Sequence, residues 1–288
     1  MPDGWSSALA LLPCEMRSSA LEKSREEPLA EELRLRRGRP PTLLSQGREK
    51  VFSPLSVTEA QLTEVLANAS RYSLHAHSAE LRQGYLCAAG GVRVGVCGTV
   101  TGEGEARTLR DFSSVCIRIP RQIPEAGREV MTALEGKSVL VLSPPGGGKT
   151  TFLRELVRHV SDAGCRVGLA DARGELAAVW EGLPQFDVGC CTDVLSGGDK
   201  AEAAMLLLRT MNPQVVALDE ISDPADTEAA LRLNGCGVRV FATGHAAGLE
   251  QLRQRPAYRP LLENSVFQTA VIISRSARGQ RQYRAEPL

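Results

Sequence analysis

Short, almost wholly apolar runs recur through the second half of the chain, and stretches with helical spacing follow them. The runs occupy residues 139–142, 167–170, 215–218 and 238–242. Runs of this kind, without the alternation of a half-exposed strand, are typical of strands buried on both faces of a parallel sheet. The pattern therefore predicts an α/β fold with a mostly parallel sheet and helices on both of its faces.

The first 120 residues follow a different pattern. Residues 21–39 are amphipathic and charged, residues 58–68 have helical spacing, and residues 85–100 carry glycines among strand-forming residues. Residues 115–124 indicate a strand that runs into a linker, because the prolines at 120 and 124 favour extended chain. We therefore predict a smaller α+β domain over residues 1–120, with a role in regulation or oligomerisation, and a second domain over 121–288.

One motif in the second domain carries specific chemistry. Ser143 and two prolines follow the apolar run at 139–142, and then glycines 146–148, Lys149 and Thr150 stand before a helical pattern. Glycines let the backbone turn several N–H groups towards one anion, a lysine reaches the β- and γ-phosphates, and a threonine hydroxyl can bind Mg²⁺. The motif predicts a phosphate-binding loop (P-loop), although Ser143 replaces the first glycine of the usual G-x-x-x-x-G-K-[ST]. The predicted contacts are Pro145, Gly146, Gly147, Gly148, Lys149, Thr150 and Thr151.

Two adjacent carboxylates follow the apolar run at 215–218. The end of such a strand emerges at the ligand edge of a parallel sheet, which would place Asp219 and Glu220 beside the P-loop. Asp219 would hold the Mg²⁺ shell through water, and Glu220 would orient or deprotonate the attacking water. Because phosphoryl transfer depends mainly on positioning and electrostatic stabilisation, these placements would carry the chemistry.

Two further predicted strands end in polar residues. Thr243 and His245 follow the run at 238–242 and could contact a γ-phosphate or the lytic water, with an ordinary loop histidine as the alternative. Arg173 and Glu175 follow the run at 167–170 and would point into the same cleft, with a solvated, salt-bridged turn as the alternative. We treat both pairs as candidates that the spacing alone does not decide.

Composition and charge narrow the class of protein. The 288 residues include 34 lysines and arginines against 34 aspartates and glutamates. Proteins whose main partner is a nucleic-acid backbone usually carry an excess of basic residues, so we expect no direct nucleic-acid partner. The eight cysteines form no C-x-x-C pair, which favours reduced thiols in a cytosol. No apolar run approaches membrane-spanning length, so we expect a cytoplasmic protein that contacts membranes only through partners.

Taken together, these segments resemble the family of stage III sporulation protein AA. The resemblance rests on EELRLRRGRP at 31–40, GYLCAAGGVRVGVCGTV at 84–100, SPPGGGKTTFLREL, DARGEL, TDVLSGGDKAEAAMLLLRTMNPQVVALDEI at 192–221, and FATGH, in the order of the family. The second half also resembles the ATPases of type II and type IV secretion and pilus systems. The likeness implies a RecA-like P-loop ATPase domain that binds ATP and Mg²⁺ through Walker A and Walker B motifs. It makes Lys149 and Glu220 catalytic, Glu220 as the base, Glu175 an acidic-box residue and His245 a sensor.

The same resemblance implies a cellular role. It implies a cytoplasmic ATPase motor of the mother cell, a homo-oligomer with a hexameric ring as the expected form, docked peripherally on a membrane-embedded sporulation complex that faces the forespore. By that analogy, arginines would contact the nucleotide of a neighbouring subunit, and the candidates are Arg93, Arg118, Arg121 and Arg209. A nucleotide-dependent scaffold with little hydrolysis is the main alternative. A nucleic-acid-directed ATPase, suggested by the basic residues 34–39, is a weaker one.

Overall fold

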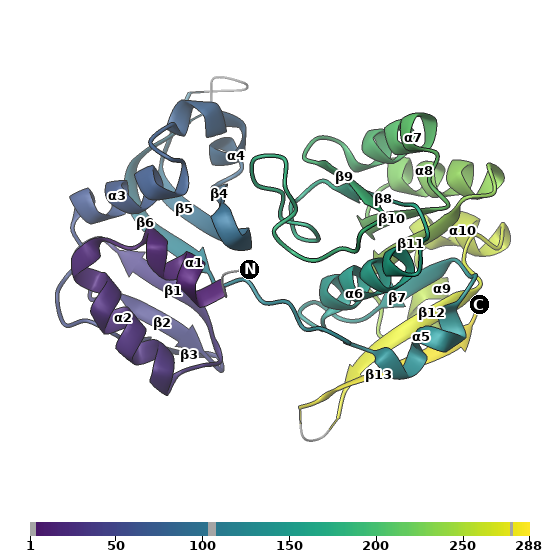
Figure 1. Ribbon diagram of the computed structural model, residues 1–288, viewed down its shortest axis with the longest axis horizontal. Coiled ribbons are helices and arrows are strands. Elements are labelled where there is room, and N and C mark those ends of the chain that lie inside the picture. The colour runs from purple at the N-terminus through teal and green to yellow at the C-terminus, as the bar shows by residue number, and fades with distance from the viewer. Residues whose placement is uncertain (1–3, 103–107, 277–278) are drawn as a thin grey trace. The chain divides into compact units, whose positions relative to one another are not determined.

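The structure, a computed structural model, describes residues 4–102, 108–276 and 279–288. The chain forms two compact units, each with its own sheet (Figure 1). Unit 1 comprises residues 1–121 together with 180–185, and unit 2 comprises residues 122–179 together with 186–288. The regulatory or oligomerisation role assigned to the first domain remains a prediction.

Unit 1 is an antiparallel sheet with helices packed on one face. Its strands, in the order β3-β2-β1-β6-β5-β4, are β1 (Ala30–Arg36), β2 (Thr42–Ser45), β3 (Arg48–Val51), β4 (Tyr85–Ala88), β5 (Val92–Thr101) and β6 (Thr108–Arg118). Its helices are α1 (Gly4–Leu11), α2 (Cys14–Glu26), α3 (Glu59–Ala69) and α4 (Ser78–Arg82). Alternation in β1 buries Leu33 and Leu35 against these helices. The charged residues 21–39 thus lie partly in α2 and partly in β1.

Unit 2 contains the predicted parallel sheet. Its strands, in the order β13-β12-β7-β11-β10-β8-β9, are β7 (Val139–Leu142), β8 (Val167–Asp171), β9 (Thr192–Ser196), β10 (Val215–Glu220), β11 (Arg239–Gly244), β12 (Thr269–Arg275) and β13 (Arg281–Pro287). Adjacent strands run parallel from β12 to β9, and β13 pairs antiparallel with β12. The helices are α5 (Arg128–Leu134), α6 (Lys149–Asp162), α7 (Lys200–Met211), α8 (Pro224–Gly235), α9 (Leu249–Arg253) and α10 (Arg259–Glu263).

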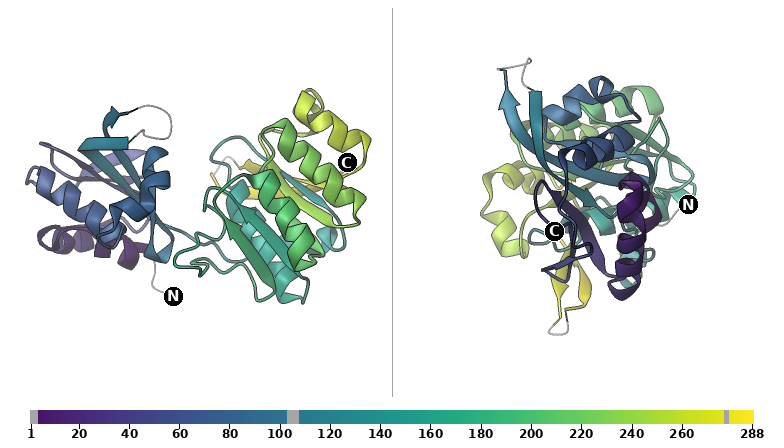
Figure 2. Two further views of the ribbon diagram at one scale, coloured as in Figure 1. Left: turned by 90° about the horizontal axis from the view of Figure 1, so that it is seen from above. Right: turned by 90° about the vertical axis from the view of Figure 1, so that its left-hand side faces the viewer.

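Helices cover both faces of this sheet (Figures 1 and 2). Alternate residues of a strand point to opposite faces, so in β7 Val139 and Val141 pack with α5 and α6, whereas Leu140 and Leu142 pack with α7 and α8. Burial on both faces is the physical reason for the uninterrupted apolar runs. The four predicted runs are β7, β8, β10 and β11, and the predicted α/β fold with a mostly parallel sheet is confirmed.

The topology of unit 2 brings the four polar segments to one edge. β7, β11, β10 and β8 are consecutive neighbours and run in the same direction, so their carboxyl ends lie together. The P-loop follows β7. Asp219 and Glu220 are the last residues of β10, Thr243 and His245 lie at the end of β11, and Arg173 and Glu175 follow β8. In the part of the chain that the structure describes, no helix combines the length and apolar character needed to cross a membrane.

Candidate functional site

The P-loop depends on its glycines. Gly146 and Gly148 have φ angles of 71° and 106°, which side-chain-bearing residues rarely adopt. A Cβ at Gly147 would lie 2.0 Å from Ser143 Oγ, so the serine hydroxyl fills the space beside it. The buried Ser143 donates its N–H to the carbonyl of Gly244 at 3.4 Å, which ties the loop to the end of β11. The loop ends at the N-terminus of α6, whose free N–H groups suit an anion. The remaining predicted contacts, Pro145, Thr150 and Thr151, lie in the loop and the first turn of α6.

A continuous chain of polar contacts joins the P-loop to the ends of β10 and β11. Lys149 Nζ lies 2.8 Å from His245 Nδ1, and His245 Nε2 lies 3.0 Å from Glu220 Oε2. If the lysine donates to Nδ1, the imidazole is the neutral tautomer that carries its proton on Nε2 and donates it to the carboxylate. The structure therefore brings together a predicted phosphate-binding lysine, a predicted sensor and a predicted base.

Lys149 is buried, with 7% of its surface exposed. Burial lowers the pKa of its ammonium group, and the negative charges of Glu220 and Asp219 oppose this change. The protonated lysine thus depends on nearby negative charge. A bound phosphate would supply more of it.

Asp219 is an unpaired carboxylate at the same edge. Only 9% of its surface is exposed, and among the described residues its side chain has no hydrogen-bond or ion-pair partner. Burial, followed by the charges of Glu175 and Asp171, raises its pKa to about 6. The hydroxyl of Thr243 is also buried without a partner in the described structure. An unpaired carboxylate and an unpaired hydroxyl group thus lie at the edge where the polar segments meet.

The carboxylate of Asp219 and the hydroxyl of Thr150 fit a magnesium ion that is bound together with a nucleotide. Mg²⁺ prefers oxygen ligands and usually takes one or two from protein and the rest from phosphate and water. Asp219 and Thr150 offer a carboxylate and a hydroxyl of this kind. Within residues 4–102, 108–276 and 279–288, no three metal-binding side chains gather at one point. The residues therefore suit a metal whose remaining ligands come from a triphosphate and water.

Buried side chains stabilise the turn after β8 through hydrogen bonds to its backbone. The fully buried carboxylate of Asp171 accepts N–H groups from Glu175, Leu176 and Ala177 at 2.9, 3.1 and 2.8 Å. Arg154 of α6 donates to the carbonyls of Leu176 and Glu175 at 2.6 and 2.7 Å, and burial lowers its pKa to about 10. Glu175 is half-buried and close enough to raise the pKa of Asp219, whereas Arg173 is exposed.

Other supporting residues were not predicted. Lys200 at the start of α7 donates to the carbonyl of Glu220 and forms an ion pair with Asp226 at 2.8 Å. Asp226 in turn accepts the N–H of Ser222 at 2.9 Å, so the lysine secures the segment that follows β10. The GGDK sequence at 197–200 shows a lysine at a helix start, but no spacing rule connects it to Glu220.

Two arginines of the β12–β13 hairpin contact the P-loop from its carbonyl side. Arg281 donates through Nε to the carbonyl of Gly147 at 3.1 Å, and Arg275 lies 3.5 Å from the carbonyl of Gly146. A Cβ at Gly148 would lie 2.6 Å from Arg281 Nε. Because a trans peptide points its C=O and N–H in opposite directions, the bond to Gly147 turns the N–H of Gly148 away from Arg281.

The arginines proposed to act in trans have varied surroundings. In unit 1, three of them contact other residues of that unit: Arg121 donates to the carbonyls of Pro28 and Ala30 at 2.8 Å, Arg118 lies 3.7 Å from Glu32, and Arg93 stacks 4.0 Å from the centre of the Tyr85 ring. Arg209 is exposed near the end of α7. A role across a subunit boundary remains a prediction for each.

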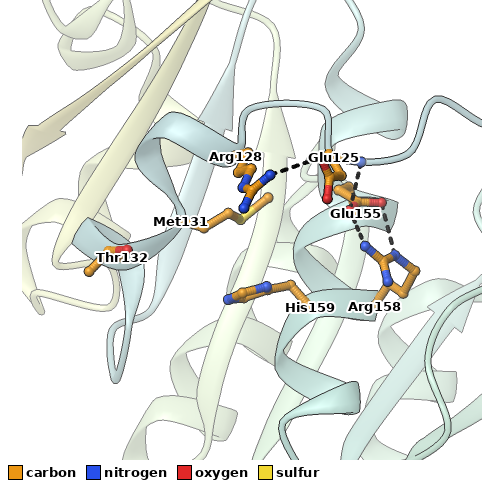
Figure 3. Close-up of a pocket in the computed structure, with 7 residues that line it drawn as sticks. All are labelled: Glu125, Arg128, Met131, Thr132, Glu155, Arg158 and His159. Atoms are coloured by element: carbon orange, nitrogen blue, oxygen red, sulfur yellow. Dashed lines mark hydrogen bonds and ion pairs between the residues drawn. The ribbon is translucent and has the colours of Figure 1, made fainter.

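A separate hollow of about 320 Å³ lies between α5 and α6 (Figure 3). Its charged groups are already paired, since Arg158 binds Glu155 and Asp162, and Arg128 lies 3.3 Å from Glu125. It contains none of the predicted site residues. The strand-end cluster is therefore the better candidate for chemistry.

Comparisons with known proteins show the family and the fold. A family model described as "Sporulation stage III, protein AA" matches residues 6–282. Stage III sporulation protein AA of Bacillus subtilis (strain 168) is 34% identical over 277 residues, which cover 92% of this chain and 90% of that protein. The predicted resemblance is confirmed.

Solved structures similar to this chain include an ATPase and a pilus retraction motor. The ATPase DotB of Legionella pneumophila matches with a TM-score of 0.64 at 16% identity and covers 96% of this chain and 81% of its own. The pilus retraction motor PilT, solved with bound ADP, matches with a TM-score of 0.61 at 19% identity over 93% and 81% of the two chains. At such identities the likeness concerns the fold, and the predicted RecA-like core with a smaller N-terminal domain is confirmed.

Proposed function

The chain belongs to the stage III sporulation protein AA family, and we propose that it is an ATPase that binds ATP with Mg²⁺ and hydrolyses it. The observation that carries the proposal is the contact chain from Lys149 through His245 to Glu220. Hydrolysis needs a phosphate-binding group and a water-positioning carboxylate on either side of one phosphorus atom. At the edge of the sheet in unit 2, Lys149 and Glu220 would fill these two roles.

The residues would divide the work as follows. The N–H groups of the loop and of the start of α6 would bind the phosphates, with Lys149 on the β- and γ-phosphates. Thr150 and Asp219 would hold Mg²⁺, directly and through water, and the ion when bound neutralises charge on the phosphate oxygens. Glu220 would orient the attacking water and accept its proton. Glu175 would add to the negative charge that faces the ion.

His245 would sense whether a nucleotide is bound at the P-loop. The side chain touches both Lys149 and Glu220, so a change in the lysine's partners alters the hydrogen bonding of the proposed base. The hydroxyl of Thr243, buried without a partner within the described residues, could then donate to the phosphate or to water. This arrangement would allow ATP to influence the position of β11 and its loop.

We further propose the cellular setting that the family suggests. The ATPase would act in the cytoplasm of the mother cell as a homo-oligomer, expected to be a hexamer, docked on a membrane-embedded sporulation complex. Hydrolysis would drive assembly or transport between mother cell and forespore. Membrane contact would then pass through the partner subunit.

A phosphate-release assay on the purified protein with ATP and Mg²⁺ tests the activity. We expect Lys149→Ala to reduce turnover at least about a hundredfold, as the loss of a charge-stabilising donor does in other active sites. Lys137→Ala is the matched control, because Lys137 is exposed and its ammonium group donates to the carbonyl of Ala133, near the end of α5. Turnover that Lys149→Ala leaves unchanged would overturn the proposal.

A nucleotide-dependent scaffold is the second candidate. It is favoured by the same contact chain, because a lysine and a base that already bind one histidine have to rearrange before hydrolysis. Glu220→Gln separates the two functions, since it removes the proton acceptor and keeps the size of the side chain. ATP-induced oligomerisation that persists in this variant, with negligible turnover in the wild type, supports the scaffold.

A further inference from the structure

Two adjacent cysteines lie outside the proposed ATPase site. Cys190 and Cys191 immediately precede β9, at the amino ends of the parallel strands, whereas the proposed nucleotide site lies at the carboxyl ends. Cys190 is exposed and Cys191 half-buried. Their sulfur atoms lie 3.8 Å apart, so both thiols face the same point. Neither thiol has a part in the proposed reaction.

The backbone of this dithiol is fixed against the end of α6. The N–H of Cys191 donates to Ser161 Oγ at 2.8 Å, and the N–H of Cys190 donates to Asp162 at 3.2 Å. Gly189 precedes the pair with φ 88°, and a Cβ there would lie 2.4 Å from the Cβ of Ser161. Only glycine allows so close an approach, so the loop presents the two thiols in a constrained geometry.

The sulfur separation suits a bound ion. A disulfide would require the two sulfurs to move from 3.8 Å to about 2.05 Å apart. Two thiolates that share one tetrahedral ion through bonds of about 2.3 Å place their sulfurs about 3.8 Å apart. The observed distance therefore matches chelation of an ion without movement of the chain.

We propose that Cys190 and Cys191 form a two-sulfur chelating site for a thiophilic divalent metal ion, of the class that includes Zn²⁺ and Cd²⁺. Among the described residues no third metal-binding side chain completes a cluster, so water or an external thiol would fill the remaining positions. Both thiols lose their protons to the solvent when the ion binds, and no change of oxidation state is needed.

A titration of the full-length reduced protein with Cd²⁺ tests the site through the ultraviolet thiolate-to-metal absorption. We expect one ion per chain, and affinity at least about tenfold weaker in Cys190→Ser and in Cys191→Ser. Cys14→Ser, Cys97→Ser and Cys236→Ser are matched controls, because each removes an exposed thiol elsewhere, and they should bind as the wild type does.

Three results would overturn the proposal. They are unchanged Cd²⁺ binding in both serine variants, one ion shared by two chains, or a Cys190–Cys191 disulfide that forms in air in the presence of Cd²⁺. A circular dichroism spectrum shows whether a variant has folded. The proposal is independent of the ATPase function, because the doubly substituted protein should hydrolyse ATP at the wild-type rate whether or not it binds Cd²⁺.

Discussion

Replacing Asp219 by asparagine should stabilise the nucleotide-free protein. The wild-type carboxylate is buried without a partner in the described structure, and its pKa rises from 3.8 to about 6. A difference of about two pKa units corresponds to about 3 kcal/mol of destabilisation at a pH well above 6. The neutral amide avoids this cost but is itself buried, so we expect a net gain of about 2 kcal/mol. For a unit of this size the gain corresponds to a rise in Tm of about 4–8 °C.

The pH dependence of this stability gain tests whether the charge of Asp219 causes it. Because the folded-state pKa is raised, the protonated carboxyl stabilises the fold at low pH, and this stability is lost as the pH rises through about 6. The penalty that Asp219→Asn removes should therefore be full at pH 8, about half at pH 5, about a fifth at pH 4 and absent below about pH 3. Calorimetry without nucleotide and Mg²⁺ measures it, and the same variant should lose Mg²⁺-dependent hydrolysis.

Asp171→Asn is the matched control at the neighbouring strand end. Its carboxylate accepts three backbone N–H groups, and an amide that presents an NH₂ group to those donors leaves some of them unsatisfied. The same substitution should therefore lower stability here by about 1–3 kcal/mol. Equal effects of the two substitutions, or a gain at Asp219 that does not vary with pH, would refute the electrostatic argument.

Three further predictions concern the same edge. Arg281→Ala should weaken nucleotide binding about 5- to 30-fold in a fluorescence titration, because it removes a charged hydrogen-bond donor to Gly147 that is worth about 1–2 kcal/mol. Arg284→Ala on the same strand should have no effect. Equal affinities of the two variants would contradict this prediction. Gly148→Ala should lower the free energy of unfolding by about 1–3 kcal/mol, measured in urea, since φ is 106° there and Arg281 occupies the space of the new methyl group. ATP hydrolysis should fall as the pH drops below about 6, because Asp219 takes up a proton that Mg²⁺ has to displace; a rate constant that stays level down to pH 5 would exclude this role.

The sequence predicts the residues at the carboxyl ends of the central strands better than it predicts the contacts that support them. Apolar runs bounded by polar residues locate four central strands, since burial on both faces leaves a local signature. The P-loop is equally local, because its glycines, Lys149 and Thr150 are consecutive. The ends of β10 and β11 come from distant parts of the sequence, yet parallel order brings them together by a general rule. The proximity of Glu220 to Lys149 could therefore be predicted without coordinates.

The supporting contacts could not be predicted, because they depend on distances that no local pattern encodes. Arg281 reaches the P-loop across more than a hundred residues, and only the pairing of β12 with β7 places its hairpin there. β13 has only half-buried and exposed positions, so the strand has no apolar run. The return of residues 180–185 to unit 1 likewise has no signature in composition.

An irregularity in β10 explains how two adjacent carboxylates can serve one site. Consecutive residues of a regular strand point to opposite faces, which would separate Asp219 from Glu220. Here the pairing with β11 shifts, so that Leu218 pairs with Ala242 and Glu220 with Thr243, and Asp219 is the extra residue. Such a bulge bends the strand and re-aims side chains, which lets Asp219 lie near Lys149 while Glu220 contacts His245. The separation of the two carboxylates is therefore built into the backbone of β10, and the proposed division between a metal-binding carboxylate and a base would follow from it.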